Sequence, residues 1–352
     1  MTTVVAPFAT HTQHAELYHC AAGGHTDWLL LRLTDPDGVT GWGECSDAGP
    51  LAAVLRVLAG EAADAATCRA VRGAVRQALA DQAARRAGQP LWQWLGAHRP
   101  PGPVELTALL RRTAHPGTAA ADAGAAVAAG FATVRIAPFD SPGGDRLGHL
   151  GLARVRAVRA AVGASVRLLV DCHQRLPLGE LTPLLAPLAR LGVDRLEDGA
   201  SLARPAELAE LRRRTALPLA ARADSAGPGQ LARAAGLVDL LLVDARRAGG
   251  PAAVLELAAS GARVGLRNPS GPIATLHSAH LAAALPGEPL EYPFGEVAAE
   301  RRAGLLRAGE RISGGQLLLP AGPGLGDEPD LRHPAVVPLW RGALTEPGCP
   351  PV

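Results

Sequence analysis

The feature that most constrains the fold is a series of short apolar runs, each ending in a polar residue and followed by a helical Ala-, Leu- and Arg-rich segment. Successive runs begin about 20–35 residues apart, which is the length of one βα unit. Eight such units predict a closed parallel barrel whose chemistry lies at the carboxyl ends of the strands. The expected strands are Val104–Leu109, Thr133–Ile136, Val166–Val170, Arg195–Leu196, Leu217–Ala221, Leu240–Val243, Val264–Leu266 and Leu290–Tyr292.

The segments on either side of this series predict a smaller companion domain. Trp28–Leu33 and Val39–Glu44 have the character of strands separated by a turn, and the stretch from Leu51 to Leu95 is helical in pattern. From Ala303 the chain is rich in loops, with a further strand at Gly314–Pro320. We therefore expect an N-terminal α+β domain (1–103), a barrel (104–302) and a C-terminal segment (303–352) that packs on the first domain.

Composition excludes several classes of function. A net charge of +2, without an arginine stripe interleaved with aromatics, argues against nucleic-acid binding. No apolar run is long enough to cross a membrane, and the N-terminus lacks the pattern of a signal peptide. The five scattered cysteines indicate neither a disulfide framework nor a zinc ribbon, so we expect a cytoplasmic protein. All 35 basic residues are arginine, which excludes a lysine base.

Acidic residues close four of the predicted barrel strands. Asp171 and Glu197 end consecutive strands, and Asp224 and Asp244 end the next two. Carboxylate oxygens from separate strands are the ligands that Mg²⁺ requires, and such an ion stabilises an enolate. The alternative is that these acids are helix caps or partners in strand-end salt bridges.

Motifs in a consistent order resemble the enolase superfamily, in its mandelate racemase/muconate lactonizing enzyme-like branch, nearest to the acid-sugar dehydratases of the mandelate racemase subgroup. The resemblance covers nearly the whole chain. It is carried by Gly41-Trp-Gly-Glu44, Pro90-Leu-Trp-Gln-Trp-Leu-Gly96, Gly130 to Asp140, Asp171-Cys-His173, Asn268-Pro-Ser-Gly-Pro272 and Gly322-Pro-Gly-Leu-Gly326.

The resemblance implies a modified TIM barrel of (β/α)7β type with an N-terminal capping domain that closes over its mouth. It also implies Mg²⁺ held by acids on the third, fourth and fifth strands, bases on the second, third or seventh strand, and a homo-oligomer. By position, Asp171 and Glu197 match the first two metal ligands. The third ligand position falls on Ala223, and Asp224 lies one residue later, so a local bulge is needed for Asp224 to serve.

The usual proton-transfer residues are replaced. Arg135 stands where the second-strand Lys is expected, and an arginine is a poor base but a good carboxylate clamp. Arg267 stands where the seventh-strand His is expected. It either forms an ion pair with Asp244, which matches the sixth-strand acid, or binds an anionic substrate.

Three further residues complete the candidate site or lie beside it. His173 is the remaining acid/base candidate because imidazole titrates near neutrality, although a hydrogen-bonding role is the alternative. Glu291 ends the eighth strand, where the family has an electrophilic or positioning acid. His277 and His280 are expected to be packing or surface residues.

These residues favour a Mg²⁺-dependent enzyme that dehydrates a small anionic hydroxy-carboxylate, such as a sugar acid. Racemisation or epimerisation is a weaker alternative, since it needs bases on both faces of the α-carbon. A second hypothesis is a catalytically impaired member that serves in anionic ligand binding, regulation or assembly. A guanidinium of Arg135, Arg222 or Arg267 in the metal position would argue against the enzyme.

Overall fold

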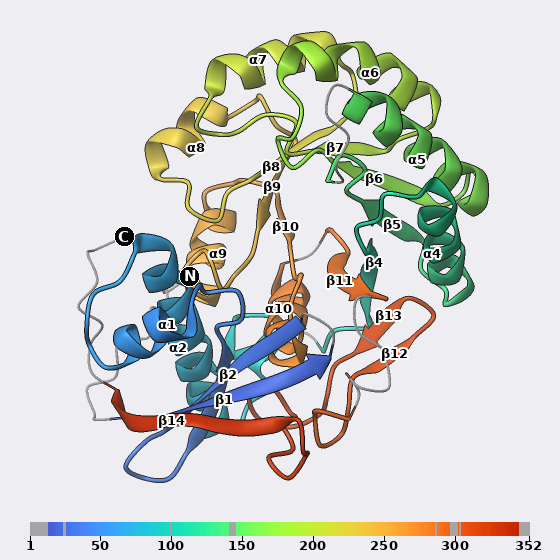
Figure 1. Ribbon diagram of the computed structural model, residues 1–352. Helices are drawn as coiled ribbons and strands as arrows, with labels where there is room; N and C mark the ends of the chain where they lie inside the picture. Colours follow the sequence, from blue (N-terminus) through green and yellow to red (C-terminus); the bar gives the residue numbers. More distant parts are fainter. Residues whose placement is uncertain are drawn as a thin grey trace.

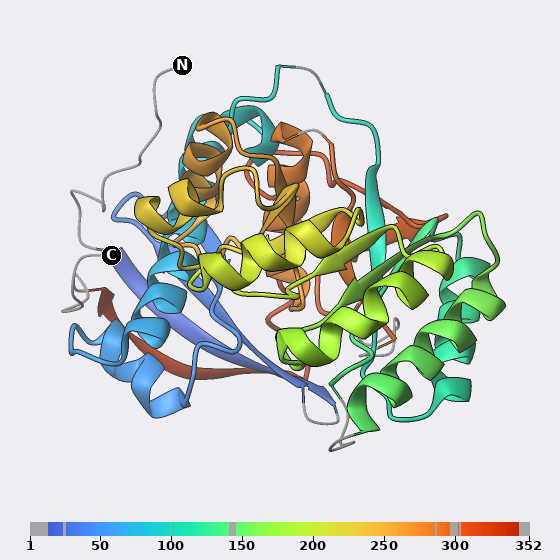
Figure 2. The same ribbon diagram turned by 90° about the horizontal axis from the view of Figure 1, so that it is seen from above.

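The fold is described from a computed structural model. The residues whose structure is described here are 13–23, 26–98, 100–140, 146–285, 287–295, 302 and 304–344. Figures 1 and 2 show two views of the chain, with a helix-covered parallel sheet on one side and a smaller antiparallel sheet on the other.

The smaller sheet is built from both ends of the chain. Its strand order is β14-β1-β2-β3, and all of its pairings are antiparallel. In both views the red β14 lies alongside the blue N-terminal strands (Figures 1 and 2). Helices pack on this sheet, and α2 lies against β3. The elements are β1 (Gln13–Gly23), β2 (Thr26–Thr34), β3 (Thr40–Glu44), β14 (Val336–Leu344), α1 (Leu51–Leu58), α2 (Ala65–Arg86) and α3 (Leu91–Trp94).

The larger sheet is the barrel. Parallel pairing runs from β11 through β4 and on in sequence order to β10. Its strands are β4 (Val104–Leu110), β5 (Thr133–Ile136), β6 (Arg167–Asp171), β7 (Arg195–Glu197), β8 (Leu219–Arg222), β9 (Leu240–Val243), β10 (Val264–Leu266) and β11 (Leu290–Phe294). Among the described residues, one helix connects each strand to the next: α4 (Pro116–Ala128), α5 (Leu147–Val162), α6 (Leu178–Arg190), α7 (Pro205–Arg214), α8 (Pro228–Ala234), α9 (Pro251–Ala259) and α10 (Pro272–Ala284).

The expected (β/α)7β barrel with an N-terminal capping domain is confirmed. Three predicted strands, Thr133–Ile136, Leu240–Val243 and Val264–Leu266, have the observed bounds, and the others are shifted by a few residues. The predicted strand at Gly314–Pro320 is the second half of a hairpin, β12 (Arg311–Ser313) and β13 (Gln316–Leu318).

The C-terminal segment contributes to both sheets. β13 pairs antiparallel with the start of β4, and β14 pairs with β1. The turn between β12 and β13 is Gly314-Gly315, both at positive φ, a conformation that two consecutive non-glycine residues would adopt only with strain. The segment therefore touches the barrel as well as the first domain, and the three-part division of the chain stays a prediction.

The described part of the chain contains both free and disulfide-bonded cysteines, and its helices are too short or too polar to span a membrane. Cys20, Cys45 and Cys172 are buried free thiols, whereas Cys68 is disulfide-bonded. Cys349 lies outside the described residues. No helix among the described residues has the length and apolar character needed to cross a bilayer.

Two buried histidines join α10 to its surroundings, as expected for packing residues. His277 lies within hydrogen-bond distance of the Trp42 carbonyl, with 2.7 Å between Nε2 and the oxygen. His280 accepts from the backbone N–H of Trp92 at Nδ1 and faces the Leu325 carbonyl with Nε2. Burial lowers the pKa of His277 to about 3 and that of His280 to about 4, so both are neutral at pH 7.

We expect these histidines to make the fold sensitive to acid. In the unfolded chain each takes up a proton below about pH 6.5, whereas the folded chain resists protonation down to the lowered pKa, so stability is lost as pH falls from about 6.5 towards 4. At pH 5 each of the two histidines lowers the free energy of unfolding by about 2 kcal/mol relative to neutral pH. Urea unfolding at pH 7.5 and pH 5 should show a smaller pH effect in His277→Gln, and an unchanged one in the exposed-site control His98→Gln. Equal pH effects in the wild type and His277→Gln would contradict this account.

Candidate functional site

The centre of the barrel mouth is occupied by an arginine side chain. Arg135 lies on β5, and its guanidinium points at acids from three other strands. Nε donates to Oε2 of Glu197 at 2.6 Å, and Nη2 donates to Asp171. Nη1 lies 3.1 Å from Oε2 of Glu291 without forming a hydrogen bond. The side chain is 2% exposed, so water contributes little to its solvation and the carboxylates must balance its charge.

Strand register explains why Asp171 and Glu197 converge. The two residues are paired across β6 and β7, as their positions at consecutive strand ends predicted. Burial acts to raise the pKa of both carboxyls, but the charges around them outweigh it. Arg135 and His173 hold the pKa of Asp171 well below its ordinary value, and Arg135 and Arg195 lower that of Glu197. Both acids are therefore ionised partners of arginines.

Arg195 binds the second carboxylate oxygen of Glu197. Its Nε and Nη2 donate to Oε1 of Glu197 at 3.0 and 2.8 Å, and its Nη1 donates to Glu288. Sequence reasoning missed Arg195, which had been assigned only to a strand. Its position two residues before Glu197 places both side chains on one face of β7, which is a signal that alternation could have supplied.

His173 is held between two acids. Its Nδ1 lies 2.5 Å from Oδ2 of Asp140, and its Nε2 lies 2.6 Å from Oδ2 of Asp171. Burial acts to lower its pKa, but these two carboxylates raise it, so the doubly protonated ring is favoured. Asp140, another residue that sequence reasoning did not single out as functional, also receives a bond from Arg175 at 3.1 Å. The catalytic role of His173 stays a prediction, and both of its nitrogens are engaged by the protein.

Asp224 lies apart from the acids around Arg135. It accepts a hydrogen bond from the backbone N–H of Asp244 at 2.7 Å, and among the described residues no hydrogen bond or ion pair joins it to Asp171 or Glu197. Burial and the neighbouring Asp244 raise its pKa to about 6. The bulge that a ligand role required is not formed, because the backbone N–H of Ala223 keeps a regular bond to the Leu242 carbonyl.

The expected ion pair between Asp244 and Arg267 is wrong. Asp244 is bonded instead to Arg246, with Nη2–Oδ2 and Nε–Oδ1 distances of 2.6 and 3.1 Å. The turn after β9 brings Arg246 back onto Asp244 only two residues away, and reading the strand ends alone could not show this. Arg267 approaches Glu291 instead, at 3.8 Å.

The metal expected at Asp171, Glu197 and Asp224 does not fit the residues as they lie. A guanidinium occupies the space between the first two acids, and the third faces elsewhere. Within the described part of the chain, no group of three or more His, Cys, Asp or Glu side chains has the geometry to hold a metal ion.

A cavity of about 820 Å³ lies above this cluster, between the barrel and the first domain. Charged groups dominate its wall. The barrel contributes Leu109, Leu110, Arg112, Arg135, Ala137, His173, Arg222, Asp224, Asp244, Arg247, Arg267 and Pro269, and the first domain contributes His19, Asp27, Trp28, Leu29, Asp47, Gly49 and Leu51.

The guanidinium of Arg267 lines the cavity and has few protein partners. Its side chain is 10% exposed, and its guanidinium donates no hydrogen bond to any described residue. Buried N–H groups without a partner also occur at Nη1 of Arg135 and Nε of Arg222. A buried donor without a hydrogen-bonding partner is costly, and an anion placed against these atoms would receive charge-assisted bonds.

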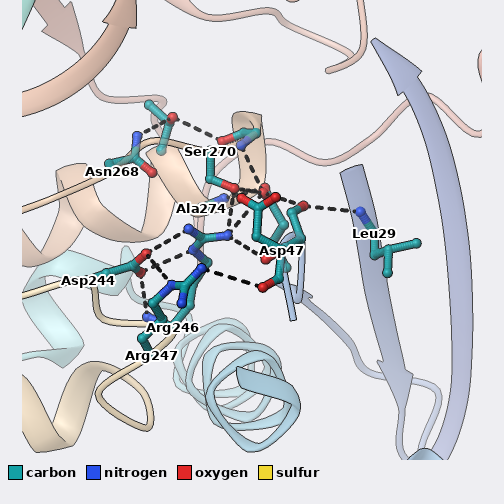
Figure 3. A network of polar contacts seen from close by, with 12 residues as sticks. Leu29, Asp47, Asp244, Arg246, Arg247, Asn268, Ser270 and Ala274 are labelled. Carbon is teal, nitrogen blue, oxygen red and sulfur yellow. Dashed lines mark hydrogen bonds and ion pairs between the residues drawn. The ribbon is translucent and has the colours of Figure 1, made fainter. Parts of the chain in front are cut away.

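A buried network fixes the first domain to the barrel beside this cavity (Figure 3). Oε1 of Glu44 accepts from the Ser270 hydroxyl and the Gly271 N–H, and Oε2 accepts from the Ala274 N–H. This acid from β3 therefore caps the N-terminus of α10 across the domain boundary. Arg246 joins the same network through the Ser46 carbonyl and the Ser270 hydroxyl.

The two domains also meet backbone to backbone. A Cβ added to Gly73, in the middle of α2, would collide with the carbonyl oxygen of Arg246. Only glycine allows α2 to approach this loop so closely. The cavity wall is therefore shared by two domains that are in close contact.

Breaking the network around Glu44 should destabilise the protein. Glu44→Ala removes the acceptor of two helix N–H groups and leaves buried Ser270 and Arg246 without that partner. We expect the free energy of unfolding in urea to fall by about 3 kcal/mol. Glu61→Ala, at an exposed position, should change it by less than about 0.5 kcal/mol. A loss below about 1 kcal/mol for Glu44→Ala would show that the network is dispensable.

Comparison with known proteins places this geometry in context. The sequence profile of a family described as enolase C-terminal domain-like matches residues 118–333. No curated protein matches the chain in sequence.

Several solved structures share the fold at low identity. A mandelate racemase/muconate lactonizing enzyme from Jannaschia sp. CCS1 is 22% identical, with a TM-score of 0.77, 91% of this chain covered and 96% of the other. An enolase superfamily member from Salmonella Typhimurium is 17% identical, with a TM-score of 0.79 and coverages of 94% and 100%. A mandelate racemase candidate from Bordetella bronchiseptica, in complex with 2-oxoglutarate/phosphate, is 22% identical, with a TM-score of 0.77 and coverages of 92% and 96%.

Proposed function

The chain belongs to the enolase C-terminal domain-like family of the enolase superfamily, and from this premise we propose that its barrel mouth binds a small carboxylate-bearing anion. Enzymes of this superfamily are generally lyases or isomerases and generally use Mg²⁺. The proposal keeps the place where these enzymes bind substrate and changes the means of binding. Arginines, rather than a metal ion, hold the anion.

The environment of the Arg267 guanidinium is the observation that carries the proposal. Its guanidinium is nine-tenths buried, faces the cavity and lacks a hydrogen-bonding partner among the described residues. A carboxylate placed against its nitrogens would receive charge-assisted bonds, for which the planar guanidinium offers a bidentate geometry. Arg222 lies in the same wall; its Nη2 is ion-paired with Asp198 at 2.8 Å, and its Nε has no hydrogen-bonding partner among the described residues. Two cationic donors therefore suit an anion with two charged ends or one charged end and several hydroxyls.

Binding without dehydration is the function that the contacts support best. Dehydration needs a base for the α-proton and an acid for the departing hydroxyl. Arg135 is engaged by carboxylates of the protein, and both nitrogens of His173 are engaged as well. With the guanidinium of Arg135 between Asp171 and Glu197, the hypothesis of a binding, regulatory or assembly role is favoured over the dehydratase and the racemase.

Binding is tested with 2-oxoglutarate, inorganic phosphate and gluconate by isothermal titration calorimetry. We expect at least one carboxylate to bind the wild type with EDTA present. Arg267→Met should weaken it at least about tenfold, because a cationic partner is lost while side-chain bulk is kept. Arg233→Met, at an exposed position on α8, is the matched control and should bind as the wild type does.

Catalysis is tested separately by NMR in D₂O, with and without Mg²⁺. The proposal expects no exchange of the α-proton of gluconate or of other aldonates. Mg²⁺-dependent exchange in the wild type would overturn it in favour of the dehydratase or racemase. Equal affinity of the wild type and Arg267→Met for every anion would show that Arg267 does not form the anion-binding site.

A further inference from the structure

The guanidinium of Arg135 is surrounded by carboxylates of the protein itself. Carboxylates on β6, β7 and β11 converge on its guanidinium, although these strands lie on both sides of β5 in the barrel. Acids that gather around one point from three strands repel each other unless a cation lies between them. We infer that the Arg135 guanidinium is the resident cation of this barrel, in the place of a divalent metal, and that removing it uncovers a divalent-cation site.

The oxygens of the first two acids are already used. Oδ1 of Asp171 accepts the backbone N–H of His173, and its Oδ2 faces both Arg135 and the His173 ring. Oε2 of Glu197 is bound by Arg135, and Oε1 is bound by Arg195. A hard cation needs several such oxygens at once. In the wild type it would have to displace a guanidinium that is covalently part of β5.

Charge balance points the same way. Asp140, Asp171, Glu197 and Glu291 carry four formal negative charges, and Arg135, Arg195, Arg267 and the protonated His173 carry four positive ones within the same set of contacts. A divalent ion added to this buried cluster would be uncompensated, and burying such a charge is strongly unfavourable. Replacing Arg135 by a neutral residue reverses the situation, because these four acids are then left with one cation too few. Oε1 of Glu291, buried and without a hydrogen-bonding partner among the described residues, is available as a further ligand.

The inference is tested by titrating Mn²⁺ and following the EPR signal of the free ion. We expect the wild type to show no site that depends on Glu197. Arg135→Met keeps the length of the side chain and removes its charge, and it should bind Mn²⁺ at least about tenfold more tightly than the wild type. The double variant Arg135→Met/Glu197→Gln should lose the gained site. Arg195→Met is the matched control: it frees one oxygen of Glu197 but leaves Arg135 in place, so no site should appear.

The outcomes separate this inference from the proposed function, because the readout is metal binding rather than anion binding. Mn²⁺ bound by the wild type and lost in Glu197→Gln would overturn it. A folded Arg135→Met that gains no Mn²⁺ would also overturn it. If Arg135→Met does not fold, the wild-type titration and the thermal unfolding midpoint with EDTA or Mg²⁺ decide. The inference expects the same midpoint in both, and a midpoint raised by Mg²⁺ in the wild type but not in Glu197→Gln would refute it.

Discussion

The contact between one buried guanidinium and three carboxylates organises the mouth of this barrel. Arg135 and the three acids that surround it have almost no access to solvent. Breaking such a cluster by removing one partner typically costs about 3–5 kcal/mol, because a charge is left buried and unpaired. The cluster is therefore interdependent, and the strand ends that carry it cannot be altered singly. Unlike a metal ion, this cation arrives with the chain and is in place once the barrel closes.

The arginines of the barrel mouth differ in how many of their guanidinium N–H groups already have partners in the protein. Arg135 and Arg246 are almost fully committed to acids and carbonyls of the protein. Arg267 has one distant acid at 3.8 Å and no hydrogen bond to a described residue. Among these three buried arginines, Arg267 is therefore the informative one, because its donors are the least occupied by the protein. This contrast, rather than the number of positive charges, locates the anion site.

Much of the barrel could be predicted from the sequence, and the reason is periodicity. Runs such as Leu240–Val243 are fully buried and bounded by polar residues, so their limits are visible locally. β1 was not predicted, because its polar residues weaken the alternation and it pairs with β14 from the far end of the chain. The position of Asp171 beside Glu197 was foreseen from strand spacing. A guanidinium of Arg135, Arg222 or Arg267 in the metal position was named only as an outcome that would argue against the enzyme, because rotamers and neighbouring charges decide which side chain lies there and strand spacing does not.

The capping of α10 by Glu44 bears on how the protein folds. The acceptor is made early in synthesis, whereas the Gly271 and Ala274 N–H groups lie 227 and 230 residues later. The first turn of α10 thus lacks its cap until the barrel strands between the two partners are in place. Contacts of such sequence separation form slowly, because a long loop must close before they repay its entropy. In the nascent N-terminal domain, the carboxylate of Glu44 therefore has no helix to cap. The interface between this domain and α10 is expected to be among the last to form.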